Sequence, residues 1–152
     1  MTQLKALLDT NIIIHREANR IINRDIGTLF KWLDKGKYIK CVHPITIEEI
    51  KKNSNVETRN TFEVKLESYQ ILKTVAPLDQ QVYDISELID KTENDKNDTV
   101  LLNEVFCERV DLLITEDKKI HEKASRLGIA DKIFKIESFL EKVVSENPDL
   151  VS

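Results

Sequence analysis

The sequence predicts an α/β protein, a three-layer α/β/α sandwich with a mostly parallel central sheet. Two observations lead to this fold class. Short apolar runs at Leu4–Leu8 and Asp111–Thr115 have the length and composition of buried strands. Segments with apolar residues at helical spacing separate these runs. Strands that alternate with helices indicate a parallel sheet covered on both faces.

The length and composition of the chain indicate one ordinary globular domain. At 152 residues, 41% hydrophobic and 33% charged, the chain can bury a core and is too apolar to be disordered. We expect the domain to cover residues 1–145 and a polar tail to follow at 146–152. No apolar run approaches the roughly 20 residues of a membrane-spanning helix, and the N-terminus has no signal-peptide pattern. A cytoplasmic protein is therefore expected.

The first third of the chain predicts two strands and the helices between them. Leu4–Leu8 is the first strand. Apolar residues within Ile21–Leu33 fall at helical spacing and predict one or two helices, for which Gly36 is a suitable C-terminal cap. Tyr38–Val42 alternates in polarity and predicts the second strand. Pro44–Lys52 predicts a helix, because proline is tolerated in a first turn.

The middle of the chain predicts helices around a short strand. Glu57–Leu72 places apolar and aromatic residues on one helical face. Lys73–Leu78 holds a short strand interrupted by a proline. Asp79 is a suitable N-cap for a helix that reaches Ile89. The polar stretch Lys91–Lys96 predicts a loop, after which a helix begins at position 97 or 98.

The last third of the chain predicts a repeated strand–helix pattern. Asp111–Thr115 is a buried strand, and Lys118–Leu127 is a helix that stops at a glycine. Ile133–Ile136 predicts the last strand and Glu137–Val144 the last helix. These elements complete the strand and helix alternation of a parallel sheet.

Acidic residues fall where the predicted parallel strands end. The first strand is followed by Asp9, and a later strand leads to Asp117. The helix after the second strand carries Glu48 and Glu49, and Asp98 stands near the start of another helix. The carboxyl ends of parallel strands lie at one edge of a sheet, where α/β proteins bind ligands. We therefore expect these acids to converge on one site.

A cluster of carboxylates indicates a divalent cation. Unpaired carboxylates packed together repel one another, which raises their pKa values unless a cation neutralises them. Carboxylates and waters are the ligands that suit Mg²⁺ or Mn²⁺, and such an ion activates water and stabilises charge on a phosphate. Each acid taken alone is equally well explained as a helix cap. Four at one end of a sheet are less easily explained in that way.

The charge distribution is compatible with a nucleic-acid substrate. Residues 1–75 carry 13 basic and 9 acidic side chains, whereas residues 76–152 carry 10 and 18, which gives the net charge of −4. Arg16, Arg20 and Arg24 recur every four residues, so on a helix they form a basic stripe able to follow phosphates. An ordinary solvated helix face explains the same spacing equally well.

Other kinds of site find little support in the sequence. Cys41 and Cys107 lie in apolar segments without zinc-site spacing, so we expect both to be small buried hydrophobic residues. A nucleotide-binding module is disfavoured because the chain has only 3 glycines and no glycine-rich phosphate-binding motif.

Four segments resemble the motifs of PIN-domain nucleases, in the same order. They are Leu7–Ile14 (LLDTNIII), Ile45–Ile50 (ITIEEI), Asn97–Leu102 (NDTVLL) and Leu112–Lys118 (LLITEDK). The first and fourth are the more specific. The resemblance extends from about residue 4 to residue 136, which is nearly the whole chain.

The resemblance implies a compact sandwich that cuts RNA with Mg²⁺ or Mn²⁺. Asp9, Asp98 and Asp117 would hold the metal, Glu49 would bind a second metal or position water, and Thr115 would orient the nucleophile. Small PIN proteins include toxins paired with an antitoxin protein, and dimerisation is common among them, so a homodimer is expected.

Several side chains near the motifs have secondary roles in this interpretation. The motif register favours Glu49 over the adjacent Glu48. Asp95 and Glu116 are expected to be peripheral acids, and Asn11 is expected to fix the local turn.

Two alternatives compete with an active ribonuclease. An aspartyl phosphotransferase of the haloacid-dehalogenase type also opens with an aspartate at a strand end, but its chemistry needs a second carboxylate two residues later, where this chain has Asn11. A catalytically silent PIN fold that binds RNA or protein is the other alternative. Silent members lose one or more of the acids, whereas this chain retains all four.

Overall fold

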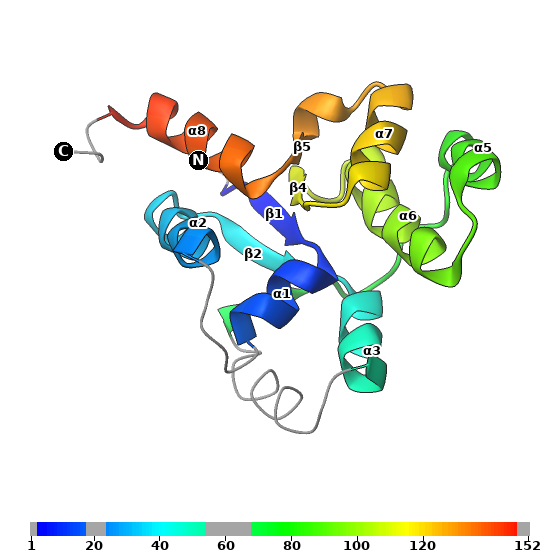
Figure 1. The fold of residues 1–152 in the computed structure, drawn as a ribbon, viewed down its shortest axis with the longest axis horizontal. Helices are drawn as coiled ribbons and strands as arrows, with labels where there is room; N and C mark the ends of the chain where they lie inside the picture. Colours follow the sequence, from blue (N-terminus) through cyan, green and yellow to red (C-terminus); the bar gives the residue numbers. More distant parts are fainter. Residues whose placement is uncertain (1–2, 18–23, 54–67, 149–152) are drawn as a thin grey trace.

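The computed structural model describes residues 3–17, 24–53 and 68–148, and within them a parallel sheet lies between two layers of helices (Figure 1). The strands are β1 (Lys5–Leu8), β2 (Ile39–Val42), β3 (Gln70–Ile71), β4 (Leu112–Ile114) and β5 (Ile133–Phe134). The α-helices are α1 (Thr10–Glu17), α2 (Arg24–Lys35), α3 (Pro44–Asn53), α5 (Gln80–Ile89), α6 (Glu93–Phe106), α7 (Lys118–Arg126) and α8 (Ile136–Glu146), and a 3₁₀ turn, η2, covers Ala130–Lys132. The predicted three-layer α/β/α sandwich is confirmed.

The order of the strands creates a crevice at the centre of the sheet. The order is β3-β2-β1-β4-β5, and every strand pairs with its neighbours in parallel. Leu7 of β1 is in register with Cys41 of β2 and Leu113 of β4. The chain moves outward from β1 to β3 and then returns to the other side of β1. The connections after β1 and β4 therefore diverge, which is the place where α/β folds bind ligands.

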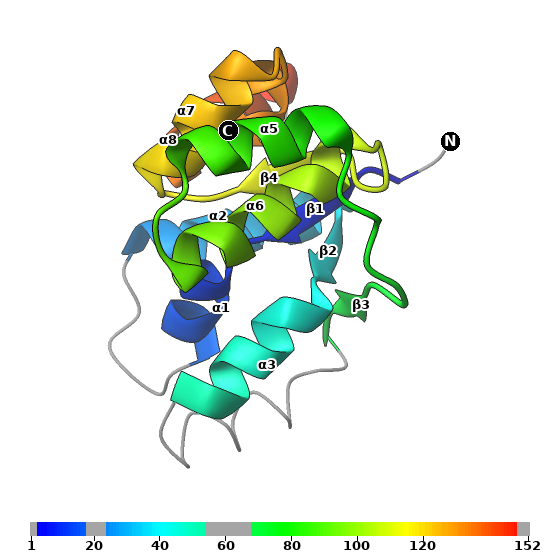
Figure 2. The same cartoon turned by 90° about the vertical axis from the view of Figure 1, so that its right-hand side faces the viewer.

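Successive side chains of the strands point to opposite faces of the sheet and belong to two separate hydrophobic clusters. Leu8 and Ile114 pack with residues of α1, α2 and α8, whereas Leu7 and Leu113 pack with residues of α6 and α7. Figure 1 shows the two groups of helices on opposite sides of the sheet, and Figure 2 shows α3 beside α1, apart from α5. Strands buried on both faces explain why the sequence shows apolar runs at β1 and β4.

Three helices end in the same left-handed motif, and two of them do so without glycine. The left-handed residues are Lys37 (φ 57°) after α2, Glu108 (φ 60°) after α6 and Gly128 (φ 76°) after α7. After each one, the next backbone N–H donates to the carbonyl five residues before it: Tyr38 to Leu33, Arg109 to Glu104 and Ile129 to Ala124. The prediction of Gly36 as the cap therefore missed the left-handed position by one residue. Gly36 is needed for space instead, since a Cβ there would lie 2.8 Å from the Tyr38 ring.

The middle of the chain departs from the predicted elements. Most of the predicted helix Glu57–Leu72 lies outside the described residues, and at its end Gln70–Ile71 form β3 instead, paired with β2. The predicted strand Lys73–Leu78 is an irregular segment. Its backbone is held by side chains of α6, because Asn103 donates to the carbonyls of Ala76 and Pro77. A sheet ladder is not needed to satisfy these backbone groups.

The start of α6 and the presence of α1 also differ from the predictions. The stretch 91–96 was predicted as a loop, but α6 begins at Glu93 with a capping box between Thr92 and Asp95. Asp98 therefore lies in the second turn and does not begin the helix. The sequence patterns did not predict α1, which follows β1 directly at Thr10.

Other predictions have mixed outcomes. Cys41 is buried as expected, but Cys107, the C-cap residue directly after α6, is exposed. The arginine stripe at 16, 20 and 24 lies outside the residues whose side chains the structure describes. Among the described helices, none has both the length and the apolar character to cross a membrane.

Candidate active site

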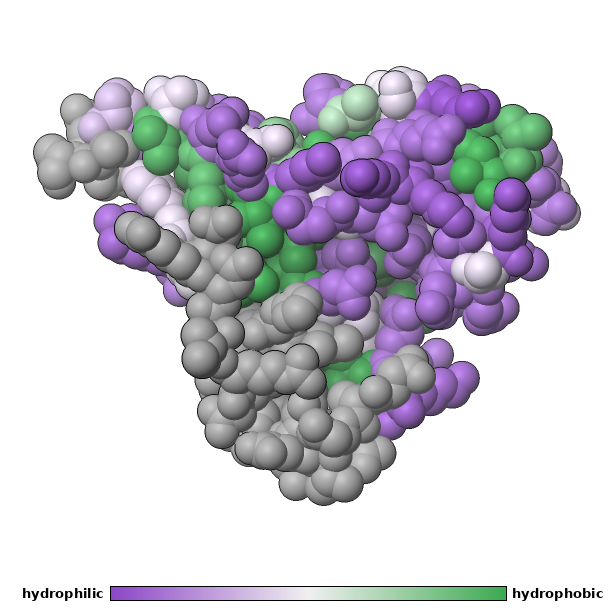
Figure 3. Space-filling view, in the orientation of Figure 1, coloured by the Kyte–Doolittle hydropathy of each residue, from purple (hydrophilic) through white to green (hydrophobic). Residues whose placement is uncertain are grey.

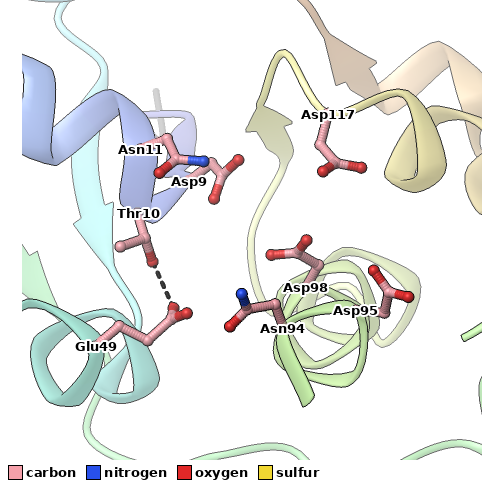
Figure 4. Close-up of a pocket in the computed structure, with 8 residues that line it drawn as sticks. All are labelled: Asp9, Thr10, Asn11, Glu49, Asn94, Asp95, Asp98 and Asp117. Atoms are coloured by element: carbon pink, nitrogen blue, oxygen red, sulfur yellow. Dashed lines mark hydrogen bonds between the residues drawn. The ribbon is translucent and has the colours of Figure 1, made fainter. Parts of the chain in front are cut away.

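A cavity of about 350 Å³ opens where β1 and β4 end, at the crevice of the sheet (Figure 4). Eight of the residues that the structure describes line it: Asp9, Thr10, Asn11, Glu49, Asn94, Asp95, Asp98 and Asp117. The β1–α1 junction, α3, α6 and the β4–α7 junction all contribute to it. The structure thus brings together the four acids that the sequence selected, and Figure 4 shows Asp9, Asp98, Asp117 and Glu49 facing a common space.

Asp9 is fixed at the end of β1. Its backbone N–H donates to the Ile114 carbonyl at 3.2 Å, so β1 and β4 stay paired up to the site. The residue is only 3% exposed, and its side chain accepts a hydrogen bond from Thr115 Oγ1 at 2.7 Å. Burial is the main cause that raises the pKa of Asp9, and the charges of Asp117 and Glu49 raise it further, against the Thr115 hydrogen bond.

Thr115 holds two acids in place. Its hydroxyl donates its single proton to Asp9 and accepts from the Asp117 backbone N–H at 3.1 Å. Thr115 is fully buried and is not among the residues that line the cavity. The geometry therefore favours a role in positioning Asp9 and the Asp117 loop over the predicted role in orienting a nucleophile.

Asp117 is both a helix cap and a cavity residue. As the N-cap of α7, it accepts the Ile120 backbone N–H on Oδ1 at 3.1 Å. The cap uses only Oδ1 of the carboxylate, and the side chain still lines the cavity. The capping explanation is thus correct for Asp117 without excluding a site role.

Glu49 reaches the cavity through a hydroxyl pair. Thr10 Oγ1 donates to Glu49 Oε1 at 2.7 Å, and Thr46 Oγ1 lies 2.9 Å from the same Thr10 oxygen. Since Thr10 has already donated its proton, Thr46 is the donor in the second bond. These bonds tie α3 to α1 and orient Glu49 inward. The adjacent Glu48 is exposed and does not line the cavity.

Asp98 is the acid with the most strongly disturbed ionisation. Burial is the largest cause that raises its pKa to about 8, followed by the charges of Asp9, Asp117 and Glu49. Within the described part of the chain, Asp98 forms no salt bridge. Asn94, one helical turn earlier, lines the same cavity and adds an amide without adding charge. Near neutral pH this arrangement favours a bound cation.

The two peripheral acids have structural partners. Asp95 accepts the backbone N–H groups of Lys91 and Thr92 and pairs with Lys119 at 3.0 Å. The hydrogen bond from Lys91 and the bond to Lys119 hold the pKa of Asp95 well below its usual range. Glu116 Oε2 accepts the Ile136 backbone N–H at 2.9 Å, at the start of α8. Both carboxylates are thus used to fix helix ends.

A fully buried lysine supports α6 behind the acids. Lys123 Nζ on α7 lies 2.8 Å from Asp90 Oδ1 and 2.7 Å from Thr99 Oγ1. Both Lys123 and the Asp90 side chain are almost completely enclosed. The charge of Lys123 lowers the pKa of Asp98 but does not cancel its rise. The network fixes α6 against α7 and the end of α5.

The residues of the cavity fit a hydrated divalent ion. Every donor is an oxygen of a carboxylate, amide or hydroxyl, which suits Mg²⁺ or Mn²⁺. In the described ranges, no three acidic, histidine or cysteine side chains converge closely enough to surround one ion. Mg²⁺ commonly keeps several waters and binds through one or two carboxylates. The open ring of acids matches that mode rather than an all-protein cage.

Comparison with known proteins adds one structural similarity. Neither a protein-family model nor a curated protein matches the sequence. A solved structure that resembles the fold is that of a PilT N-terminus domain protein, SSO1118, from the hyperthermophilic archaeon Sulfolobus solfataricus P2. The two chains are 16% identical, the similarity covers 93% of this chain and 94% of the other, and the TM-score is 0.48. A similarity at this level concerns the fold alone, and the function proposed below rests on the residues of the site.

Sequence reasoning missed three contributors to the site. Thr10 and Asn94 line the cavity, and Lys123 holds α6, which carries Asn94 and Asp98, in place. The Thr92-x-x-Asp95 spacing is a variant of the capping-box pattern and would have started α6 early enough to place Asn94 beside Asp98. No local signal marks Lys123, because its partner Asp90 lies 33 residues away.

Proposed function

We propose that the protein is a metal-dependent endoribonuclease that hydrolyses phosphodiester bonds of RNA with Mg²⁺ or Mn²⁺. The observation that carries the proposal is Asp98, a carboxyl group with a pKa raised to about 8 among three further acids and without a salt-bridge partner in the described chain. Such a cluster stabilises the fold poorly by itself but suits a divalent cation. One or two of the carboxylates of Asp9, Asp98 and Asp117 would bind the ion directly, and the others would bind it through its waters. The four PIN-like motifs support RNA as the substrate.

The chain's own groups would divide the remaining work. A bound divalent ion supplies an acidified water and stabilises charge on the reacting phosphate. Thr115 keeps Asp9 aimed at the cavity. Thr10 fixes one oxygen of Glu49, which leaves the other oxygen to accept a hydrogen bond from the attacking water. Asn94 can donate its amide protons to a phosphate oxygen without adding negative charge to the site.

The experiment is cleavage of labelled RNA oligonucleotides by the purified protein with Mn²⁺, Mg²⁺ or a chelator. We expect cleavage that requires the metal and is lost in Asp9→Asn. The pair Glu49→Gln and Glu48→Gln provides a matched control, because the residues are adjacent but only Glu49 lines the cavity. Equal cleavage by the wild type and Asp9→Asn would overturn the proposal. RNA binding without metal-dependent cleavage would favour a silent PIN-fold binding module.

The family resemblance extends the proposal to the cellular setting. It supports a cytoplasmic homodimer and a toxin whose activity is held in check by an antitoxin protein. Sedimentation of the purified protein would test the dimer. Copurification from the native source, together with growth arrest on expression of the wild type but not of Asp9→Asn, would test the toxin role. A monomer would contradict the proposed dimer. Growth that is unaffected by the wild type would contradict the toxin role.

A further inference from the structure

A second cavity, of about 300 Å³, adjoins the acidic one. The two share Asp9, Asn11 and Asp117. Among the described residues, the remaining lining of the second cavity is mostly apolar and consists of Ile12, Ile26, Ile136 and Glu116. A ligand held at the acids can therefore extend into a chamber of different chemistry without leaving the site.

The apolar walls of this chamber are preformed. Ile12, Ile26 and Ile136 come from α1, α2 and α8, and they are only 3%, 5% and 7% exposed. All three belong to the hydrophobic core, so their positions are set by the packing of the sheet face. Figure 3 shows hydrophobic surface in the hollow between α1 and α8. A preformed chamber binds a flat ligand with little loss of side-chain entropy.

Polar groups stand at the edge of the apolar walls. Asn11 is exposed at the boundary between the two cavities, and its amide has no hydrogen-bond partner within the described part of the chain. The amide offers both donors and an acceptor. Glu116 fixes one wall by accepting the Ile136 backbone N–H. An apolar body with a polar edge is the shape of a nucleobase rather than of an alkyl chain.

We propose that this chamber, defined by Ile12, Ile26 and Ile136, binds the base of the nucleotide next to the scissile phosphate. The inference rests on the proposed ribonuclease function, because the phosphate is what the acids and their ion would hold. The base packs between the isoleucine side chains, and the Asn11 amide meets its polar edge. The chamber shares Asp9 and Asp117 with the acidic cavity, so the phosphate and its own nucleoside occupy adjoining spaces.

The test compares intact and abasic RNA. The cut is first mapped in an end-labelled oligonucleotide with Mn²⁺, and the nucleotide on each side of it is then replaced in turn by an abasic residue. We expect the abasic replacement on one side to slow wild-type cleavage about tenfold and on the other side to have little effect. In Ile26→Ala the ratio of intact to abasic rates should fall to roughly threefold or less.

The control is Ile133→Ala. Ile133 is as buried as Ile26, at 5% exposed, but it lies in the opposite core cluster and away from the chamber. The ratio of two rates on one preparation does not depend on how much of the variant is folded, so it should remain about tenfold in Ile133→Ala. Equal wild-type rates on intact and abasic RNA, or equal ratios in the two variants, would overturn the base chamber and leave the ribonuclease proposal standing. Wild-type protein that cuts none of the RNAs would remove the ribonuclease proposal and the chamber with it.

Discussion

Helix α6 carries two inward-facing acids in opposite surroundings, Asp98 near its start and Glu104 near its end. Asp98 lies among the carboxylates of Asp9, Asp117 and Glu49, and its pKa is raised to about 8. Glu104 is fully buried, yet its pKa is lowered. Burial opposes ionisation in both cases, so the difference lies in the neighbours. One acid is surrounded by like charge and the other by donors.

The surroundings of Glu104 show how the fold satisfies a buried charge. Burial alone would raise the pKa of Glu104, but His43, the Ala76 backbone N–H and Arg109 together outweigh it. The distances are 3.4 Å to His43 Nε2, 2.9 Å to the Ala76 nitrogen and 3.0 Å to an Arg109 guanidinium nitrogen. His43 Nδ1 accepts the Ile45 N–H, which fixes the ring with Nε2 on the side of Glu104. Glu104 Oε2 accepts the Ala76 N–H, whereas His43 Nε2 and Glu104 Oε1 form no hydrogen bond within the described residues, so His43 and Arg109 compensate the charge by proximity.

The comparison separates an acid that stabilises the fold from one that costs it stability. A carboxylate supplied with donors contributes to folding, whereas a carboxylate among carboxylates is stabilised only when a ligand arrives. Removing each charge should therefore change stability in opposite directions. It should change activity at one end of α6 only.

The largest effect is expected on activity, from Asp98→Asn. The change keeps the shape of the side chain but removes a charge that the metal requires, so RNA cleavage should fall by about 10²–10³-fold. Initial rates at saturating Mn²⁺ measure the effect. The same variant should unfold at a higher denaturant concentration than the wild type without metal. An Asp98→Asn protein that is both active and less stable would reverse the assignment of Asp98.

The next largest effect is expected on stability, from Glu104→Ala. The change leaves His43 and Arg109 without their buried partner and frees the Ala76 N–H, so the free energy of unfolding should fall by about 3 kcal/mol. Urea denaturation followed by circular dichroism measures the loss. Glu122→Ala is the control, since Glu122 is 54% exposed in a surface pair with Arg126 and should change stability by less than roughly 0.5 kcal/mol. Equal losses in the two variants would show that the buried network contributes nothing special.

The acidic site beside the start of α6 and the buried networks behind it also differ in how far the sequence could predict them. Asp9 and Asp117 could be predicted as site residues because each follows a short apolar strand, and the end of a parallel strand fixes where the next residue lies. The roles of Glu104 and Lys123 could not be predicted, because their partners lie far away in sequence: Ala76 is 28 positions from Glu104. Contacts of that kind depend on the packing of whole elements.

Local exceptions limited the prediction of the elements themselves. β3 has only two residues, and its pairing with Cys41 and Val42 overrides the helical pattern around it. The start of α6 was missed because its capping box uses Asp95 where the usual pattern has a glutamate or glutamine. The parallel direction of the strands and the cluster of acids were accessible because they follow from the alternation of strands and helices and from where parallel strands end.

A smaller effect is expected in the pH dependence of stability without metal. The pKa of Asp98 is raised in the folded protein, from an ordinary value near 3.8 to about 8. Between these values the unfolded chain loses the proton and the folded protein keeps it, so this residue makes stability fall as pH rises from 4 to 8. The wild type should lose about 1–2 kcal/mol relative to Asp98→Asn over this range. Saturating Mg²⁺ should remove most of the difference.

Glu104 should give the opposite pH dependence. Its pKa is lowered in the folded protein, so its contribution is present above the ordinary glutamate value and is lost as pH falls through the folded pKa. Urea titrations at pH 3 to 8 on the wild type, Asp98→Asn and Glu104→Gln would separate the two acids. Parallel pH profiles for the wild type and Asp98→Asn would contradict the contrast.

The smallest effect is expected from Glu108→Gly, just beyond the stabilised end of α6. Glu108 is exposed and left-handed, with φ 60°, a conformation that costs a side chain energy but costs glycine none. Glycine should raise the free energy of unfolding by roughly 0.5–1 kcal/mol, after allowing for the extra entropy that it gives the unfolded chain. Glu108→Ala retains the Cβ and should show no gain, which separates backbone strain from loss of charge. RNA cleavage should be unchanged, because this end of α6 lies outside both cavities. Stability gained here without loss of activity would contrast with Asp98→Asn, where a gain in stability comes with loss of the site.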